Sequence, residues 1–68
     1  MNEEVFNMEL RKFLKRVGVT SQREIETAVR QALEAGKLDP KASLEAKVTL
    51  SLPALGVTEV IDGKIALS

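Results

Sequence analysis

Two clusters of polar residues in this chain of 68 residues have side chains that could take part in catalysis. Ser51 follows Lys47 by four residues, and a serine–lysine pair can supply a nucleophile and its base. Both residues fall on the polar side of an alternating segment, so we interpret them as surface residues of a strand. Glu3 and Glu4 form the second cluster, and we interpret them as charges at a helix start, where the helix dipole favours anions.

The chain lacks most of the other residue types that take part in catalysis. The chain has no His, Cys, Tyr or Trp, so it lacks both the usual general base near neutral pH and a thiol nucleophile. Disulfides are excluded, and a zinc ion would find only carboxylates as ionic ligands. We therefore predict a protein that is not an enzyme and that binds no cofactor and no metal. A domain of this size buries only about 60% of the surface of its unfolded chain, so self-association is the remaining source of stability.

The segment GVTEVIDGKI, residues 56–65, weakly resembles a phosphate-binding loop. Its glycines, Gly56 and Gly63, are two residues too far apart for that motif, and Lys64 is followed by Ile instead of Ser or Thr. Asp-Gly between two alternating apolar runs is a strong signal for a two-residue hairpin turn. We therefore predict a turn at Asp62-Gly63.

A run of basic residues without any acidic residue forms a candidate anion surface. It consists of Arg11, Lys12, Lys15, Arg16 and Arg23. The same segment resembles a DNA-binding helix-turn-helix around Gly18, but the positions six and nine residues later, which should be apolar, are Glu24 and Thr27. Since ten Lys and Arg balance ten Asp and Glu in the whole chain, we favour a solvated helix end whose cations match the helix dipole.

A first helix is predicted over about residues 3–17. Asn2 is its N-cap, and Gly18 is expected to end it as a left-handed C-cap. The apolar residues at helical spacing, which form its buried stripe, are Phe6, Leu10, Phe13, Leu14 and Val17.

A second helix is predicted over about residues 21–35. Its apolar face consists of Ile25, Ala28, Val29, Ala32 and Leu33. Ser21 and Glu24 have the spacing of a capping box, and Gly36 ends the helix. Because only two to four residues separate the two helices, we expect them to pack as a helical hairpin.

Three strands are predicted in the second half of the chain, over about residues 45–52, 57–61 and 64–67. Apolar and polar residues alternate along the first strand, which Pro53 ends. The Asp62-Gly63 turn joins the other two strands and sets which side chains share a face. It assigns Val60, Ile65 and Leu67 to the core and turns Val57, Ile61 and Ala66 outward.

The predicted fold is α+β in the order α-α-β-β-β, with the helical hairpin packed on one face of a three-stranded antiparallel meander. We expect residues 1–68 to form a single small domain. No apolar run approaches the roughly 20 residues that span a membrane, and the acidic N-terminus MNEEVFNMEL has no apolar signal core. We therefore expect a cytoplasmic protein with no membrane partner.

Some apolar residues lie outside the predicted core and form a candidate partner surface. They are Val5, Met8, Val57, Ile61 and Ala66. Such a patch on a small domain typically marks a binding surface, although loop residues 37–45 could also cover it. We predict a small non-catalytic protein-interaction module whose partner is a second copy or another protein. The alternative is a nucleic-acid-associated regulator that uses the basic segment 11–23.

Two stretches of the chain resemble a known family. They are MNEEVFNMELRKFLKRVGVTSQREIE, residues 1–26, and VIDGKIAL, residues 60–67. The likeness is to a family of short bacterial proteins of unknown function, mainly proteobacterial, and it covers nearly the whole chain. It implies a freestanding bacterial cytoplasmic protein, and it brings no activity, ligand or site residue.

Overall fold

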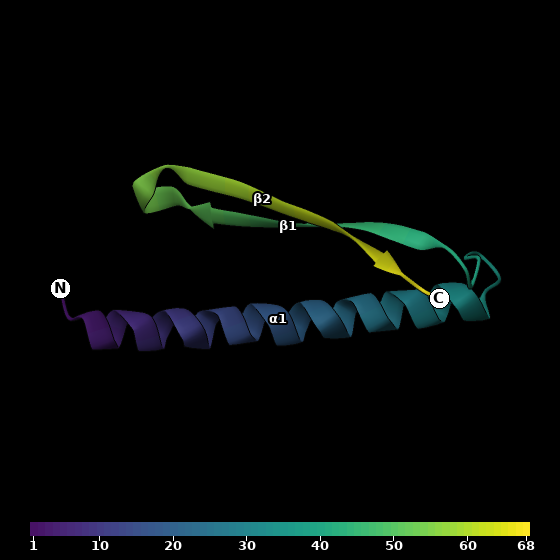
Figure 1. Ribbon diagram of the computed structural model, residues 1–68, viewed down its shortest axis with the longest axis horizontal. Helices are drawn as coiled ribbons and strands as arrows, with labels where there is room; N and C mark the ends of the chain where they lie inside the picture. The colour runs from purple at the N-terminus through teal and green to yellow at the C-terminus, as the bar shows by residue number, and fades with distance from the viewer. The chain divides into compact units, whose positions relative to one another are not determined.

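The computed structural model describes all residues from Met1 to Ser68 (Figure 1). The element order is α-β-β: the helix α1 (Glu3–Glu34), the strand β1 (Ser43–Leu52), a 3₁₀ turn η1 (Pro53–Leu55) and the strand β2 (Val57–Ala66). These elements divide into two compact units, Met1–Lys37 with the helix and Leu38–Ser68 with the hairpin. The α-α-β-β-β prediction, a helical hairpin on a three-stranded meander, is therefore wrong, although both helical and strand content were expected.

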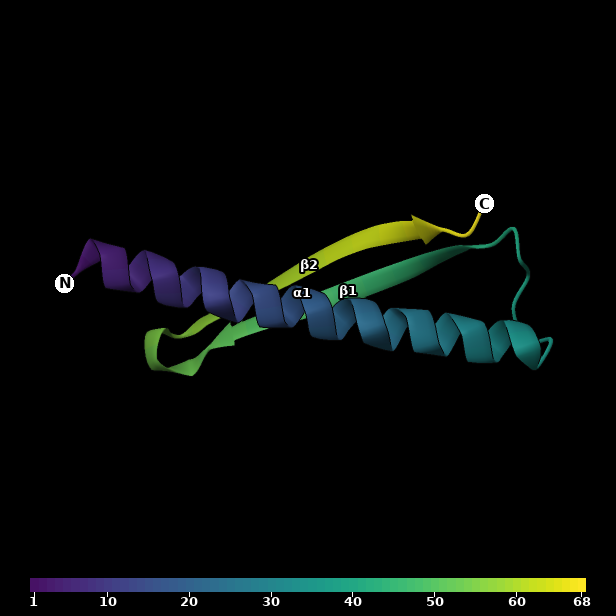
Figure 2. The same ribbon diagram turned by 90° about the horizontal axis from the view of Figure 1, so that it is seen from below.

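The two predicted helices, about 3–17 and 21–35, are one continuous helix of 32 residues. Gly18 lies inside α1 and does not adopt the positive φ that a left-handed cap would need. A glycine in a helix interior costs only about 1 kcal/mol relative to alanine, which the strong helix formers on both sides outweigh. The uninterrupted course of α1 is visible in two views (Figures 1 and 2).

Both outer ends of α1 follow the sequence prediction. The Asn2 side chain accepts hydrogen bonds from the backbone N–H groups of Glu4 and Val5, at 3.0 and 3.1 Å. At the other end Gly36 has a φ of 69°. The Gly36 N–H donates to the Leu33 carbonyl at 3.1 Å and the Lys37 N–H donates to the Ala32 carbonyl at 2.9 Å. This pair of bonds is a Schellman motif, which satisfies the last carbonyls of the helix.

The predicted strands 57–61 and 64–67 are one strand, β2, which pairs with β1 over ten residues in an antiparallel two-stranded sheet (Figure 2). Asp62 and Gly63 stand opposite Lys47 and Ala46 in this ladder and form no turn. The chain reverses instead at η1, where Gly56 has a φ of 64° and donates its N–H to the Pro53 carbonyl at 3.2 Å. A turn at Asp62-Gly63 would pair only the few residues beside it, whereas the turn at η1 pairs both strands in full.

The register gives the hairpin one apolar face and one polar face. Since side chains alternate along a strand, even-numbered residues of β1 share a face with odd-numbered residues of β2. The apolar face consists of Leu44, Ala46, Val48, Leu50, Leu52, Val57, Ile61, Gly63 and Ile65, with Glu59 as its single charged residue. The polar face carries two pairs of opposite charges across the strands, Glu45 with Lys64 and Lys47 with Asp62.

The predicted core is absent, because no residue in the chain is buried. Phe13 of the helix stripe is 50% exposed and Leu33 is 38% exposed. The expected inward set is also split, since Val60 lies on the polar face, Ile65 lies on the apolar face and Leu67 follows the strand end. No helix here has the length and apolar character that crossing a bilayer would require.

Candidate functional site

An apolar stripe follows the whole length of α1. At about 100° per residue, its members lie on one side of the helix. They are Phe6, Leu10, Phe13, Leu14, Val17, Ile25, Ala28, Val29 and Ala32. Val17 and Ile25 are joined across the expected break by Ser21, four residues from each, and all three are half-buried. Because the helix is continuous, the two apolar faces predicted for separate helices form a single surface.

The structure brings four of the five candidate anion-surface residues to one side of α1. Helical geometry places Lys12, Lys15, Arg16 and Arg23 within about 100° of one another, opposite the apolar stripe, whereas Arg11 borders the stripe. Lys12 forms the only ion pair in the chain, with Glu9 at 3.7 Å, and both side chains are largely exposed. An exposed pair of this kind contributes less than about 1 kcal/mol to stability, and the Glu9 carboxylate offsets part of the positive charge on this side.

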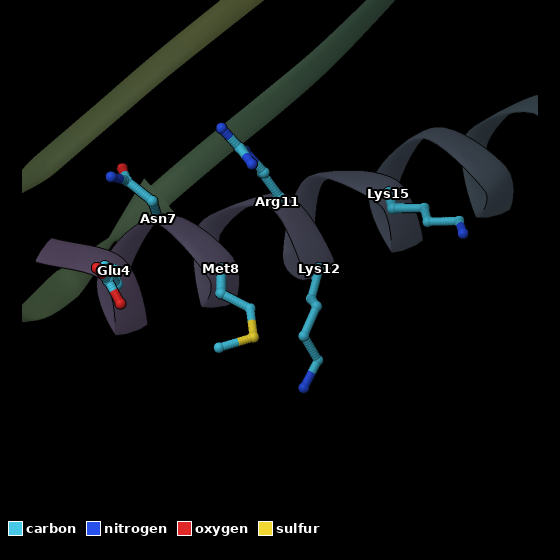
Figure 3. A pocket seen from close by; sticks show the side chains of 6 residues that line it. All are labelled: Glu4, Asn7, Met8, Arg11, Lys12 and Lys15. Carbon is cyan, nitrogen blue, oxygen red and sulfur yellow. The ribbon is translucent and has the colours of Figure 1, made fainter.

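Two shallow depressions on α1 coincide with this basic side. The residues around the first are Glu4, Asn7, Met8, Arg11, Lys12 and Lys15 (Figure 3). Met8 and Lys12 project to the same side of the helix, and Asn7 and Arg11 project to another (Figure 3). A second depression lies around Val19, between Lys12, Lys15 and Arg16. Both are open surfaces of a single helix, so neither encloses a small molecule as a typical ligand pocket does.

The five residues of the candidate partner surface are divided between the helix unit and the hairpin unit. Val5 and Met8 lie on the basic side of α1, whereas Val57 and Ile61 share the apolar face of the hairpin. Ala66 lies on the polar face, because β2 continues through Asp62 and Gly63 without the expected turn. The alternation of apolar and polar residues over 46–52 predicted a strand with one apolar side, and these apolar residues of β1 lie on the apolar face of the hairpin.

Both strands of the hairpin have a free edge, since the sheet contains only β1 and β2. The Leu67 N–H donates to the Ala42 carbonyl at 3.1 Å, which fixes the alternation of the antiparallel ladder. Even-numbered residues of β1 therefore bond to β2, and odd-numbered residues such as Glu45 and Lys47 direct their backbone N–H and C=O groups outward. These unpaired groups are a template for another strand.

The structure assembles no catalytic group from the candidates in the sequence. Lys47 and Ser51 lie on the polar face four residues apart, about 13 Å along the strand, so the serine–lysine pair does not form. No cluster of three or more Asp and Glu side chains that could hold a metal ion is present. Pairing of the strand edges and packing of the apolar faces are the interactions that the arrangement supports.

A family model described as a family of unknown function, DUF6494, matches residues 1–68, so the chain belongs to this family. The match covers the whole chain and confirms the resemblance seen in its two end segments. No curated protein matches the chain, and no solved structure matches it.

Proposed function

We propose that this member of the DUF6494 family is a small non-catalytic protein-interaction module that acts as a homodimer. In this dimer a second copy supplies the strand that the free edge of the hairpin lacks and extends its apolar face. As part of the same proposal, the dimer acts in the cytoplasm, the location that the sequence resemblance implies.

The observation that carries the proposal is the two-stranded sheet with both edges free and one apolar face. A two-stranded hairpin alone is marginally stable in water, and independent stability requires three or more strands with an apolar face, or packing against a helix. A helix covers such a face with its side chains but forms no backbone hydrogen bonds with a strand edge. Because the chain has no third strand, only another chain can complete the sheet.

Self-complementary charge favours a second copy as the partner. Each strand carries one acidic and one basic residue two positions apart on the polar face, Glu45 with Lys47 and Asp62 with Lys64. An antiparallel copy of such a strand can set each acid opposite a base, and opposite charges that face each other across strands are stabilising. Balanced charge over the whole chain also lets two copies approach without net repulsion.

A second candidate function is binding of nucleic acid by the basic side of α1. The observation in its favour is that Lys12, Lys15, Arg16 and Arg23 lie on one side of a single helix. Against it, Glu9 pairs with Lys12, and Glu26 lies on the same side of the helix farther along. We therefore rank it below self-association.

Two neighbouring substitutions test the proposed function. Val48 on the apolar face and Thr49 on the polar face are neighbours on β1 and are both exposed, so a lone hairpin tolerates lysine at either position. In the dimer, Val48→Lys places a charge on the shared apolar face and should weaken association, whereas Thr49→Lys should keep the mass of the parent. Light scattering reports the mass, and circular dichroism verifies that both variants are folded. Equal masses for both variants, at concentrations where the parent is dimeric, would contradict the role of the apolar face.

A further inference from the structure

We infer that the two copies join along the free edge of β1, antiparallel, with the two-fold axis passing at Ala46. The result is a four-stranded sheet with the strand order β2-β1-β1-β2. This inference rests on the proposed homodimer and specifies which edge it uses and in which register.

The residues on the apolar face distinguish β1 as the inner strand and β2 as the outer one. All five β1 residues of this face are uncharged and apolar, whereas β2 contributes Glu59 and Gly63. An inward-pointing charge is one of the features that keep an edge strand from pairing with another chain, and glycine weakens the interior of a strand. On an outer strand the Glu59 carboxylate can reach water, and on an inner strand it would lie within the apolar face.

Two constraints limit the register of a β1–β1 pair. The apolar faces of both copies must lie on the same side of the sheet, so paired positions must both be even-numbered or both be odd-numbered. The two-fold axis therefore passes at a residue. Hydrogen bonds form only between the odd-numbered residues, whose backbone groups point outward.

The charges of Glu45 and Lys47 then favour an axis at Ala46. An axis at Lys47 would set Lys47 opposite the partner's Lys47, which is repulsive. An axis at Val48 would set Lys47 opposite Thr49 and Glu45 opposite Ser51, which forms no charge pair. An axis at Ala46 sets Glu45 opposite the partner's Lys47 and Lys47 opposite the partner's Glu45, both as hydrogen-bonded pairs.

The same axis extends the charge pattern of each hairpin across the whole sheet. Lys64 stands opposite Glu45 within one chain, and Lys47 stands opposite Asp62. With the axis at Ala46, each row of four charges alternates in sign from one outer strand to the other. The axis itself falls on a pair of alanines that is not hydrogen-bonded, where two Cα atoms approach to about 4.5 Å and small side chains fit best.

Cysteine cross-linking tests the edge and the register, because the chain has no cysteine of its own. In the proposed dimer the two copies of Ala46 are about 4.5 Å apart between Cα atoms, which a disulfide can span. Ala46→Cys should therefore form a dimer on oxidation with glutathione disulfide. The matched control is Gly63→Cys, directly opposite Ala46 in the hairpin, where an added Cβ meets no atom within 4 Å. Its two copies would be about 15 Å apart, beyond the reach of a disulfide, so it should remain uncross-linked.

Charge exchange gives a second test that does not depend on cysteine. Glu45→Lys and Lys47→Glu each place like charges opposite each other twice in a homodimer, so each variant alone should associate roughly 10- to 100-fold more weakly than the parent. A mixture of the two variants restores opposite charges between the copies and should associate more tightly than either variant alone. The like-charge pair that each substitution creates within its own hairpin, opposite Lys64 or Asp62, stays in the mixture. Asp62→Lys mixed with Lys64→Glu is the control at the β2 edge, and this mixture should show no recovery.

The outcomes of these tests distinguish a failure of the proposed register from a failure of the proposed function. Cross-linking of Ala46→Cys alone, with recovery in the Glu45→Lys and Lys47→Glu mixture, supports the β1 edge. Three outcomes would contradict the β1 edge while the parent is dimeric. They are cross-linking of Gly63→Cys alone, equal cross-linking of both cysteine variants, and no gain in affinity when Glu45→Lys is mixed with Lys47→Glu. A parent that is monomeric contradicts the proposed function itself.

Discussion

Replacing Gly18 with alanine should stabilise the protein, because Gly18 lies in the interior of a continuous helix. An alanine β-carbon at this position meets no atom within 4 Å, and the backbone there does not have a positive φ. Glycine in a helix interior is about 1 kcal/mol less favourable than alanine, so the free energy of unfolding should rise by about that amount per chain.

Urea unfolding followed by circular dichroism at a fixed protein concentration measures this change. With a slope of about 1–3 kcal/mol per molar urea, the midpoint should rise by about 0.3–1 M. Thermal melts should show an increase of about 4–8 °C for a protein of this size. The concentration is held constant because association with a second copy makes apparent stability depend on it.

Gly56→Ala is the control for this prediction. Gly56 has a φ of 64°, a left-handed conformation that costs an alanine about 1–2 kcal/mol, so the variant should lose stability. If Gly18→Ala lowers the midpoint as Gly56→Ala does, Gly18 is a left-handed cap. In that case residues 3–34 form two helices, and the account of α1 is refuted.

Two further predictions concern α1. Asn2→Ala should destabilise the helix by about 1 kcal/mol, because it removes the acceptor for the N–H groups of Glu4 and Val5. An unchanged urea midpoint would show that this cap is not formed in solution. Duplex DNA titrated at about 150 mM salt should not bind with micromolar affinity, since the chain has no net charge. If the protein does bind DNA at that salt, and the binding is lost when Arg16 and Arg23 are changed to glutamate, nucleic-acid binding becomes the favoured function.

The sequence predicts the features of this chain that depend on short-range physics. Asn2 as the helix cap, Gly36 as the helix end and Pro53 as the end of the first strand are confirmed by the structure. Each of these is decided by the conformational limits of one residue and the hydrogen bonds of its immediate neighbours.

The predictions that failed are those in which a local signal competes with a longer element. Gly18 and the adjacent polar residues carry the signal of a helix end, but the helix gains hydrogen bonds along its whole length by continuing through them. Asp62-Gly63 carries the signal of a tight turn, but pairing of ten residues on each strand outweighs it. Neither outcome follows from a window of four residues, because the competing energy is summed over the whole element.

The misplaced turn also explains why some residues of β2 were assigned to the wrong face of the hairpin. Removing a two-residue turn changes which residues of β2 share a face, so Val60 and Ala66 move to the polar face while Ile65 joins Val57 and Ile61. In the candidate anion surface, helical periodicity places Lys12, Lys15, Arg16 and Arg23 on one side of α1. Arg11 is the exception, one residue before Lys12 and about 100° around the helix.

Sedimentation equilibrium of the unmodified chain tests the central claim most directly. The chain has a mass of 7.4 kDa, and we expect a particle of twice that mass. The dimer should persist to micromolar concentration if the free edge and the apolar face of the hairpin both take part in association. A mass of 7.4 kDa at a concentration of about 0.5 mM would place the dissociation constant near or above the millimolar range and contradict the claim that a second copy completes the sheet.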